Sequence, residues 1–243
     1  MMKFNNIVFV FSIFILGCDS NKKAPSIQSN GELVIVDSSD VKTNLLLYTN
    51  NHRNGYYPVY YLGKFSDTIR LGNRTIPKYE VDSEKHSRLE DFTSPDSIKM
   101  RIIVDTTFSL SYTEFYEKFD EKQKRNVVDS TKSYKAIPIL IYNQSNSIIP
   151  VGWSNKVGYM VRQIKNDKGE WIDIETPIDY YCLTGARLLI IEPKQMMVAK
   201  LIRHNGNVQA ICRLKFANFG GTVYSNTFID FIDKHDKRKS ESM

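Results

Sequence analysis

The sequence has few of the residues that build catalytic and cofactor sites. It contains four histidines and three cysteines among 243 residues. No H-E-x-x-H or C-x-x-C spacing occurs, so the chain offers no compact zinc motif. Its 12 glycines fall in neither a G-x-G-x-x-G nor a G-x-x-x-x-G-K pattern, which excludes the common nucleotide-binding loops. The sequence therefore predicts no metal, no cofactor and no catalytic residue.

Long apolar runs are also scarce. Ile7–Leu16 is apolar except for Ser12, and these ten or so residues are too few for a membrane-spanning helix, which needs roughly 20. Lys3 precedes the run and Gly17 follows it, which is the layout of a signal peptide. Ile15 is too bulky for ordinary signal cleavage, which takes small residues at both positions of its site.

The four residues Ile15-Leu16-Gly17-Cys18 resemble the lipobox of bacterial lipoproteins, in which an aliphatic, a variable and a small residue precede cysteine. In that family the thiol receives a diacylglyceryl group, the preceding peptide is removed, and the new amine is acylated, for example with palmitate. The resemblance implies that Cys18 is lipidated and that the protein is held to a membrane lipid in the cell envelope. Two or more acyl chains give stable attachment. An ordinary signal with an incidental cysteine is the alternative.

The membrane and the face remain open. Asp19 directly follows Cys18. In some bacteria an acidic residue there retains a lipoprotein in the inner membrane, and in others acidic residues just after the cysteine favour the cell surface. The resemblance therefore implies a periplasmic or a surface-facing location without choosing between them.

Short apolar runs bounded by turn residues dominate the rest of the chain, as expected for strands. No long amphipathic helix interrupts them, which predicts an all-β protein with an antiparallel immunoglobulin-like sandwich in its C-terminal half. Residues 114–125 predict a strand that runs into a charged loop, with a one-turn helix as the alternative. The predicted strands are Leu33–Val36, Leu45–Tyr48, Tyr56–Leu62, Thr68–Leu71, Ile98–Val104, Thr107–Tyr112, Ala136–Tyr142 and Thr222–Ile232.

Two hairpins stand out in the second half. Val157–Lys165 and Glu170–Glu175 flank a polar turn that contains glycine, and Gln195–Arg203 and Val208–Phe216 flank Asn205-Gly206. Asn-Gly between alternating strands is the strongest short hairpin signal. In Val208–Phe216 the apolar residues alternate with polar ones, which predicts one buried face.

These patterns predict five segments. A break near 127–134 separates the two β-rich regions. The segments are a signal peptide at 1–17, a flexible polar tether at 18–30, an N-terminal β-rich region at 31–128, an immunoglobulin-like β-sandwich at 129–233 and a polar tail at 234–243.

Cys182 and Cys212 are candidates for a disulfide bond. Export permits such a bond, and with Cys18 lipidated the cysteine count is even. Closing a loop of about 30 residues would contribute roughly 3–4 kcal/mol in the chain-entropy model. In the alternative, Cys212 packs as a free thiol on its apolar strand face. In both cases its role is structural.

Charge and aromatic content indicate the kind of partner. The formal net charge of +6 is spread along the chain, without the concentrated basic face of nucleic-acid-binding proteins. Tyr56-Tyr57, Tyr60-Tyr61, Trp153 and Trp171 are candidates for stacking on sugars or for contact with a partner. In strands, however, each tyrosine doublet places one ring on each face, so half of these rings belong to the core.

We therefore expect a lipid-anchored cell-envelope protein with a binding or scaffolding role towards an envelope partner, and no nucleic-acid ligand. The absence of catalytic motifs favours binding over catalysis. One alternative is an envelope glycan or peptide hydrolase with a dispersed active site. Another is a periplasmic inhibitor or immunity protein that uses a surface loop such as Ser83–Ser97.

Overall fold

The computed structural model describes residues 33–37, 55, 57–71, 99–153, 156–177, 188–218 and 221–233. These residues form strands, turns and connections without a helix, so the predicted all-β class is confirmed. They belong to one compact unit, Glu32–Met243. The predicted signal peptide, tether and polar tail lie outside the described residues, as do the strand expected at Leu45–Tyr48 and the loop Ser83–Ser97.

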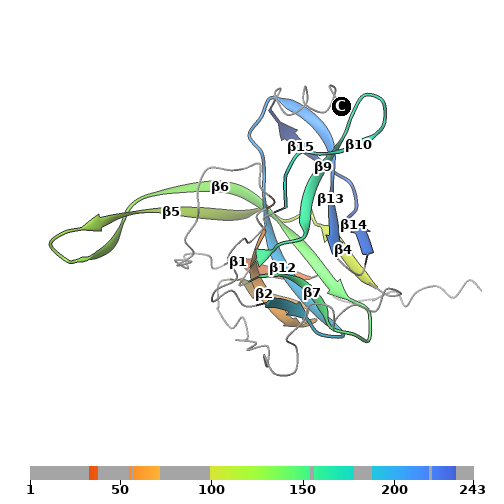
Figure 1. The fold of residues 1–243 in the computed structure, drawn as a ribbon, viewed down its shortest axis with the longest axis horizontal. Helices are drawn as coiled ribbons and strands as arrows, with labels where there is room; N and C mark the ends of the chain where they lie inside the picture. The colour runs from red at the N-terminus through yellow and green to blue at the C-terminus, as the bar shows by residue number, and fades with distance from the viewer. Residues whose placement is uncertain are drawn as a thin grey trace, which may run out of the picture. The chain divides into compact units, whose positions relative to one another are not determined.

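The largest sheet has eight strands and draws on both halves of the chain (Figure 1). Its neighbouring strands that are paired in the described residues run antiparallel. Its order is β11 (Leu188–Ile191), β7 (Ile149–Trp153), β8 (Lys156–Val157), β2 (Tyr57–Lys64), β12 (Gln195–Ile202), β6 (Arg125–Asn143) and β4 (Met100–Val104), with β5 (Leu110–Asp120) also paired to β6.

Two smaller sheets complete the unit. The five-stranded sheet is antiparallel and has the order β10 (Trp171–Asp173), β9 (Met160–Lys165), β13 (Val208–Asn218) and β14 (Gly221–Tyr224), with β15 (Phe228–Ile232) also paired to β13. The two-stranded sheet pairs β1 (Val34–Asp37) with β3 (Thr68–Leu71) in parallel.

The eight-stranded and five-stranded sheets share one hydrophobic core. The buried side chains of this core come from both sheets, among them Val59, Ile139, Ile164 and Leu214. On β13 the predicted alternation is confirmed, because Cys212, Leu214 and Phe216 are buried while the intervening residues are not. The shared core fixes which face of the five-stranded sheet is turned outward.

The central strands of the eight-stranded sheet are buried on both faces. Met196 to Leu201 of β12 are all buried, and successive side chains alternate between two core clusters. Met197, Ala199 and Leu201 join the shared core, whereas Met196 and Val198 pack with Ile69 and Leu71 of β3. A strand covered on both faces requires a largely apolar run, and this segment supplies one that only Lys200 interrupts.

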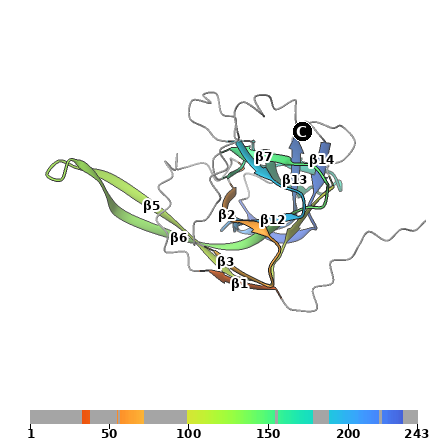
Figure 2. The same ribbon diagram turned by 90° about the horizontal axis from the view of Figure 1, so that it is seen from below.

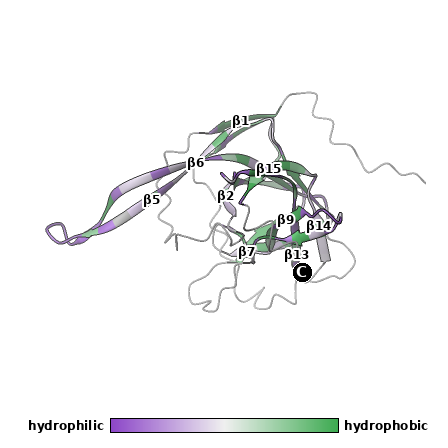
Figure 3. Ribbon diagram, turned by 90° about the horizontal axis from the view of Figure 1, so that it is seen from above, coloured by the Kyte–Doolittle hydropathy of each residue, from purple (hydrophilic) through white to green (hydrophobic). Residues whose placement is uncertain are grey.

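β5 and β6 continue beyond the sheet as a two-stranded ribbon (Figures 1 and 2). Residues 125–134 of β6 pair with β5 alone among the described strands. The part of the ribbon beyond the sheet is mainly hydrophilic (Figure 3). Asp120 accepts hydrogen bonds from the backbone N–H groups of Lys122 and Gln123 in the turn. The prediction of a strand running into a charged loop at 114–125 is thus confirmed.

The first predicted hairpin is confirmed and the second is wrong. β9 and β10 pair antiparallel around a turn in which Gly169 has φ 84°. By contrast, β12 pairs with β2 and β6, whereas β13 pairs with β9, β14 and β15, so the two strands flanking Asn205-Gly206 belong to different sheets.

A close backbone contact explains why Gly206 is not part of a hairpin turn. A Cβ atom at this position would lie 2.0 Å from the carbonyl carbon and oxygen of Ile232. The Gly206 N–H donates to the Phe231 carbonyl oxygen at 3.1 Å. The glycine therefore allows the connection between the sheets to pass close to β15, a use of glycine that a sequence pattern does not distinguish from a turn.

Strands from both predicted β-rich regions pair within the eight-stranded sheet. β2 and β4 come from the N-terminal region, and they pair with β12 and β6 respectively. The expected boundary at 128/129 falls inside β6, which is continuous across the break predicted near 127–134.

Candidate binding face and buried charged clusters

The outward side of the five-stranded sheet carries an unusual set of exposed side chains. Six large hydrophobic side chains of the described residues are exposed, and four of them belong to this sheet: Ile211, Tyr224, Ile229 and Phe231. Strand pairing brings them together, because Ile211 is opposite Ile229 and lies two residues from Arg213 on the same face of β13. Contiguous exposed apolar groups mark interaction surfaces more often than isolated ones do.

Next to these apolar side chains lies a cation stacked between two aromatic rings. The Arg213 Cζ is 4.2 Å from the ring centroid of Trp171 and 3.8 Å from that of Tyr224. Trp171 is on β10 and Tyr224 is on β14, so the rings approach from opposite sides of β13. We call the surface formed by Gln163, Trp171, Ile211, Arg213, Tyr224, Ile229 and Phe231 the outer face.

A polar chain beside the aromatic rings holds Arg213 in position. The Arg213 Nε donates to the Gln163 Oε1 at 2.7 Å, and the Gln163 Nε2 donates to the Asp173 Oδ1 at 2.5 Å. The other oxygen of Asp173 is 3.0 Å from the Lys215 Nζ. Tryptophan, tyrosine and arginine are the residue types most enriched where binding energy concentrates in protein interfaces. The outer face therefore has the composition of a binding surface.

A second group of polar residues is buried between the sheets. Arg162 on β9 is almost fully buried, and its Nη1 donates to the Asp230 Oδ2 at 2.6 Å. Its Nη2 donates to the Ile202 carbonyl oxygen at 2.8 Å. Its Nε lies 3.4 Å from the Glu175 Oε1 without forming a hydrogen bond. The Tyr57 hydroxyl donates to Glu175, which links this cluster to β2 in the other sheet.

The charges of this cluster compensate one another. Arg203 donates from Nε to the Asp230 Oδ1 at 3.0 Å, so two arginines face two carboxylates. Burial alone would lower the pKa of Arg162, but Glu175, Tyr57 and Asp230 outweigh it and raise that pKa. Burial, and then the charge of Glu175, raise the pKa of Tyr57 well above its usual value. An arginine held charged between two carboxylates and an un-ionised tyrosine indicate a structural cross-link between sheets.

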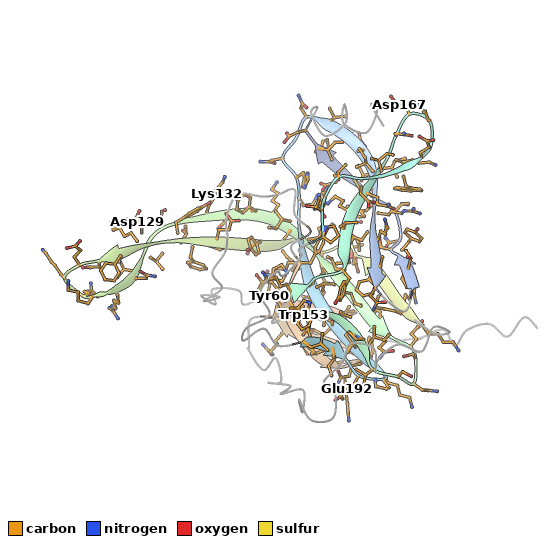
Figure 4. All side chains as sticks on the ribbon, viewed as in Figure 1. Tyr60, Asp129, Lys132, Trp153, Asp167 and Glu192 are labelled. Atoms are coloured by element: carbon orange, nitrogen blue, oxygen red, sulfur yellow. The ribbon has the colours of Figure 1, made fainter. Side chains whose placement is uncertain are left out.

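A third polar group connects β1 to the eight-stranded sheet. Lys200 on β12 is fully buried, and its Nζ lies 2.9 Å from both carboxylate oxygens of Asp37 on β1. The same nitrogen donates to the Ser111 carbonyl oxygen at 2.6 Å and lies 4.3 Å from the ring centroid of Tyr60, which Figure 4 labels. Burial lowers the pKa of Lys200, and Asp37 opposes this shift.

Comparison with protein-family models, curated proteins and solved structures finds no match for this chain. The described residues contain no group of three or more histidine, cysteine, aspartate or glutamate side chains placed to hold a metal ion. No helix in the same part of the chain is long and apolar enough to cross a bilayer.

The predicted cysteine sites fall largely outside the described residues. Cys18 and Cys182 both lie there. Cys212 is a fully buried free thiol whose pKa burial raises to about 12. This is the packing expected in the alternative to a disulfide bond, and the bond between Cys182 and Cys212 stays a prediction.

The aromatic candidates divide between the core and the surface. Tyr57 is buried in the charged cluster, and Tyr60 stacks under Lys200. The Tyr61 hydroxyl donates to the Lys64 carbonyl oxygen at 2.5 Å. Trp153 is partly buried at the end of β7 and Trp171 lies on the outer face, while Tyr56 is outside the described residues.

Most residues of the outer face carry no sequence motif. Ile211 is an apolar residue at a position of β13 where the alternation calls for a polar one, and it is 45% exposed. Ile229 and Phe231 of β15 also occupy alternate positions in an apolar strand, which is the period of a single sheet face. Arg213 gave no signal, since its two ring contacts come from different strands, Tyr224 from the next strand β14 and Trp171 from the distant β10.

Proposed function

We propose that this chain is a lipid-anchored protein of the bacterial cell envelope that binds a partner through the outer face. The gathering of three exposed hydrophobic side chains, Ile211, Ile229 and Phe231, beside the Trp171–Arg213–Tyr224 stack carries the binding part of this proposal. The sequence Ile15-Leu16-Gly17-Cys18 carries the anchoring part. Burying the outer face against a partner would stabilise the complex by roughly 25 cal/mol for each Å² of apolar area removed from water.

We further propose that the eight-stranded and five-stranded sheets form a sandwich of immunoglobulin-like type. Antiparallel pairing in both sheets and the core that they share support this assignment. Such a sandwich hosts many functions, so the outer face, and not the fold, is the feature that indicates binding.

The buried acids support binding over hydrolysis. A hydrolase with a dispersed active site would need carboxylates that meet a substrate in a cleft. Glu175 and Asp230 are both buried and both contact Arg162. Such acids are already engaged in holding the two sheets together.

The anchor is tested by labelling with a fatty acid and by the substitution Cys18→Ser. We expect the parent protein to carry the label and to sediment with membranes, and the variant to lose both properties. If the variant fractionates with the membrane as the parent does, the anchor is not at Cys18.

The outer face is tested with a photo-crosslinking phenylalanine analogue introduced in cells. Phe231 on the outer face is 44% exposed, and Phe119 on the ribbon is 58% exposed, so the two positions are matched in residue type and exposure. We expect a discrete adduct from the position of Phe231, reduced by Ile229→Asp, and none from the position of Phe119. Equal labelling from both positions would contradict the proposal.

A further inference from the structure

Arg213 has hydrogen-bonding capacity that the described part of the chain does not use. Its Nε donates to Gln163, and its faces are covered by Trp171 and Tyr224. Its two terminal nitrogens have no hydrogen-bond partner among the described residues. A guanidinium group carries five N–H donors in one plane, so the stacked rings leave four of them available at the edge.

The stacking also prepares Arg213 for binding. A long side chain normally loses rotamer freedom when it binds a ligand, which weakens binding. Here the two rings and Gln163 already restrict the guanidinium group. A guanidinium group carries one positive charge. A fixed planar fork of this kind matches the two oxygens of a carboxylate.

Among the described residues, no carboxylate forms an ion pair with Arg213. Asp173 is the carboxylate in its hydrogen-bonded chain, and both of its oxygens are engaged, one by Gln163 and the other by Lys215. The charges of Lys215 and Asp173 compensate each other. The hydrogen-bonded group as a whole therefore keeps one net positive charge, that of Arg213. An anionic ligand would complete it.

The surroundings decide which anion fits. Ile211, Ile229 and Phe231 lie on the same face as Arg213 and offer no hydrogen bonds. Sugar hydroxyls placed against them would lose hydrogen bonds to water without replacement, which is costly. Aliphatic and aromatic side chains placed there would bury apolar area on both partners.

We propose that Arg213 binds a carboxylate supplied by a protein segment in which an acidic residue is flanked by apolar side chains. This inference rests on the proposed binding role of the outer face, and it adds the chemistry of the ligand. The terminal nitrogens of Arg213 take the carboxylate, and Ile211, Ile229 and Phe231 take the apolar neighbours.

Trp171 supplies a local reporter for the test. The chain has two tryptophans, so Trp153→Phe leaves the fluorescence of Trp171 alone. The full chain carrying Trp153→Phe and Cys18→Ser is titrated with a capped pentapeptide that has one glutamate between pairs of isoleucine and phenylalanine. The same peptide with glutamine in place of glutamate is the comparison ligand.

We expect the glutamate peptide to change the Trp171 emission and to bind at least about 10-fold more tightly than the glutamine peptide, as expected for a charge-assisted bidentate hydrogen bond. Arg213→Gln should abolish the difference. Arg213→Lys should reduce it, because lysine keeps the charge without the fork. Lys132→Gln is the matched control, since it removes another cation near a tyrosine ring, 4.9 Å from the Tyr134 centroid, and should change nothing.

The outcomes separate this inference from the binding role of the outer face. Equal affinities for the two peptides, both weakened by Ile229→Asp, would overturn the role of Arg213 and leave the binding face standing. Binding that neither Arg213→Gln nor Ile229→Asp weakens, or no binding of either peptide, would overturn both. If inorganic phosphate at the same concentration changes the Trp171 emission as strongly as the glutamate peptide, the site is a general anion site and the inference fails.

Discussion

At the scale of single residues, the main structural feature is the pairing of buried charges. Arg162 and Asp230 are both buried, and the same carboxylate also accepts from Arg203. Bringing charges out of water is costly, and their mutual attraction offsets this cost only while the partners remain in place. The intact cluster therefore contributes little net stability, but removing one of its members should lower the free energy of unfolding strongly.

Asp230→Ala should be strongly destabilising. It leaves Arg162 without its closest carboxylate, and removing one partner of a buried pair costs about 3–5 kcal/mol. Asp129→Ala on the ribbon (Asp129 is labelled in Figure 4) is the control, because Asp129 pairs with an exposed Lys118 and exposed pairs contribute up to about 1 kcal/mol. Urea unfolding of both variants gives the comparison, and similar losses would contradict the structural role of the cluster.

Cys212 should make stability fall at alkaline pH. Its pKa is raised from 9.0 to about 12, mainly by burial, so in this pH range the folded state holds a proton that the unfolded state has released. Its contribution to stability is complete below pH 9 and is lost as the pH rises from 9 to 12, at up to about 1.4 kcal/mol per pH unit. Cys212→Ala should therefore lose less stability between pH 9 and pH 11 than the parent.

Urea unfolding across this range, with reductant present, measures the two slopes. Equal slopes would show that the thiol does not titrate differently in the two states. The parent protein kept free of reductant and alkylated in its native and unfolded states tests the disulfide prediction. A bond to Cys182 would protect Cys212 from alkylation after unfolding, whereas a free buried thiol would react only then.

At the scale of elements, an ion pair with a fully buried lysine helps to hold β1 to the body. Lys200 is fully buried and Asp37 is 14% exposed. The pairing of β1 with β3 adds only four residue pairs. Ile35 also packs against a core cluster, so we expect the ion pair to supply part of what fixes this first described strand.

A double-mutant cycle tests this dependence. Asp37→Asn leaves a buried lysine without an anion and should cost about 3 kcal/mol. Lys200→Met in the same chain replaces the lysine with an apolar side chain of similar length, and the double variant should recover at least about 1 kcal/mol of that loss. Denaturant unfolding of the parent, the two single variants and the double variant gives the coupling energy. A coupling near zero would contradict the pair's role in holding β1.

The connection from β12 to β13 shows why strand patterns were more predictable than strand partners. The alternation on β13 follows from local periodicity, and the structure confirms it. The partner of each strand depends on contacts between distant residues, so Asn205-Gly206 indicated a hairpin that does not exist. Gly169 also indicated a turn, and there φ 84° confirms it.

Substituting the two glycines distinguishes their roles. Gly206→Ala brings a Cβ to within 2.0 Å of the Ile232 backbone, which must move, so we expect a loss of at least about 2 kcal/mol. Gly169→Ala meets only the end of the Lys165 side chain at 3.8 Å, and its positive φ should cost about 1 kcal/mol. Urea unfolding ranks the two variants, and the reverse order would mean that residues 203–206 pass β15 less closely than described.

At the scale of the whole molecule, the same distinction separates what the sequence predicted of the binding site from what it missed. Trp171 was identified as a recognition candidate because a tryptophan is visible in a sequence, although its place beside a turn favoured simple edge packing. Arg213 was missed because its role arises only when β10 and β14 come to opposite sides of β13. Tyr57 was also a candidate, and its burial against Glu175 gives it a structural role.

Strands from both halves of the chain depend on each other, so the described body should unfold as one unit. β2 and β4 obtain their antiparallel partners from β12 and β6, and the shared core takes residues from both halves. A cut at 128/129 separates β2, β4 and β5 from these partners. We therefore expect neither 31–128 nor 129–233 to fold alone, whereas 31–243 unfolds in a single transition that circular dichroism and tryptophan fluorescence report at the same urea concentration.

A cut between Glu121 and Lys122, in the turn of the ribbon, is the matched control. It leaves β6 continuous and in contact with both β12 and β4, so the two pieces should stay associated and folded. A reversible cooperative transition in 129–233 by itself would show instead that the C-terminal half is an independent domain.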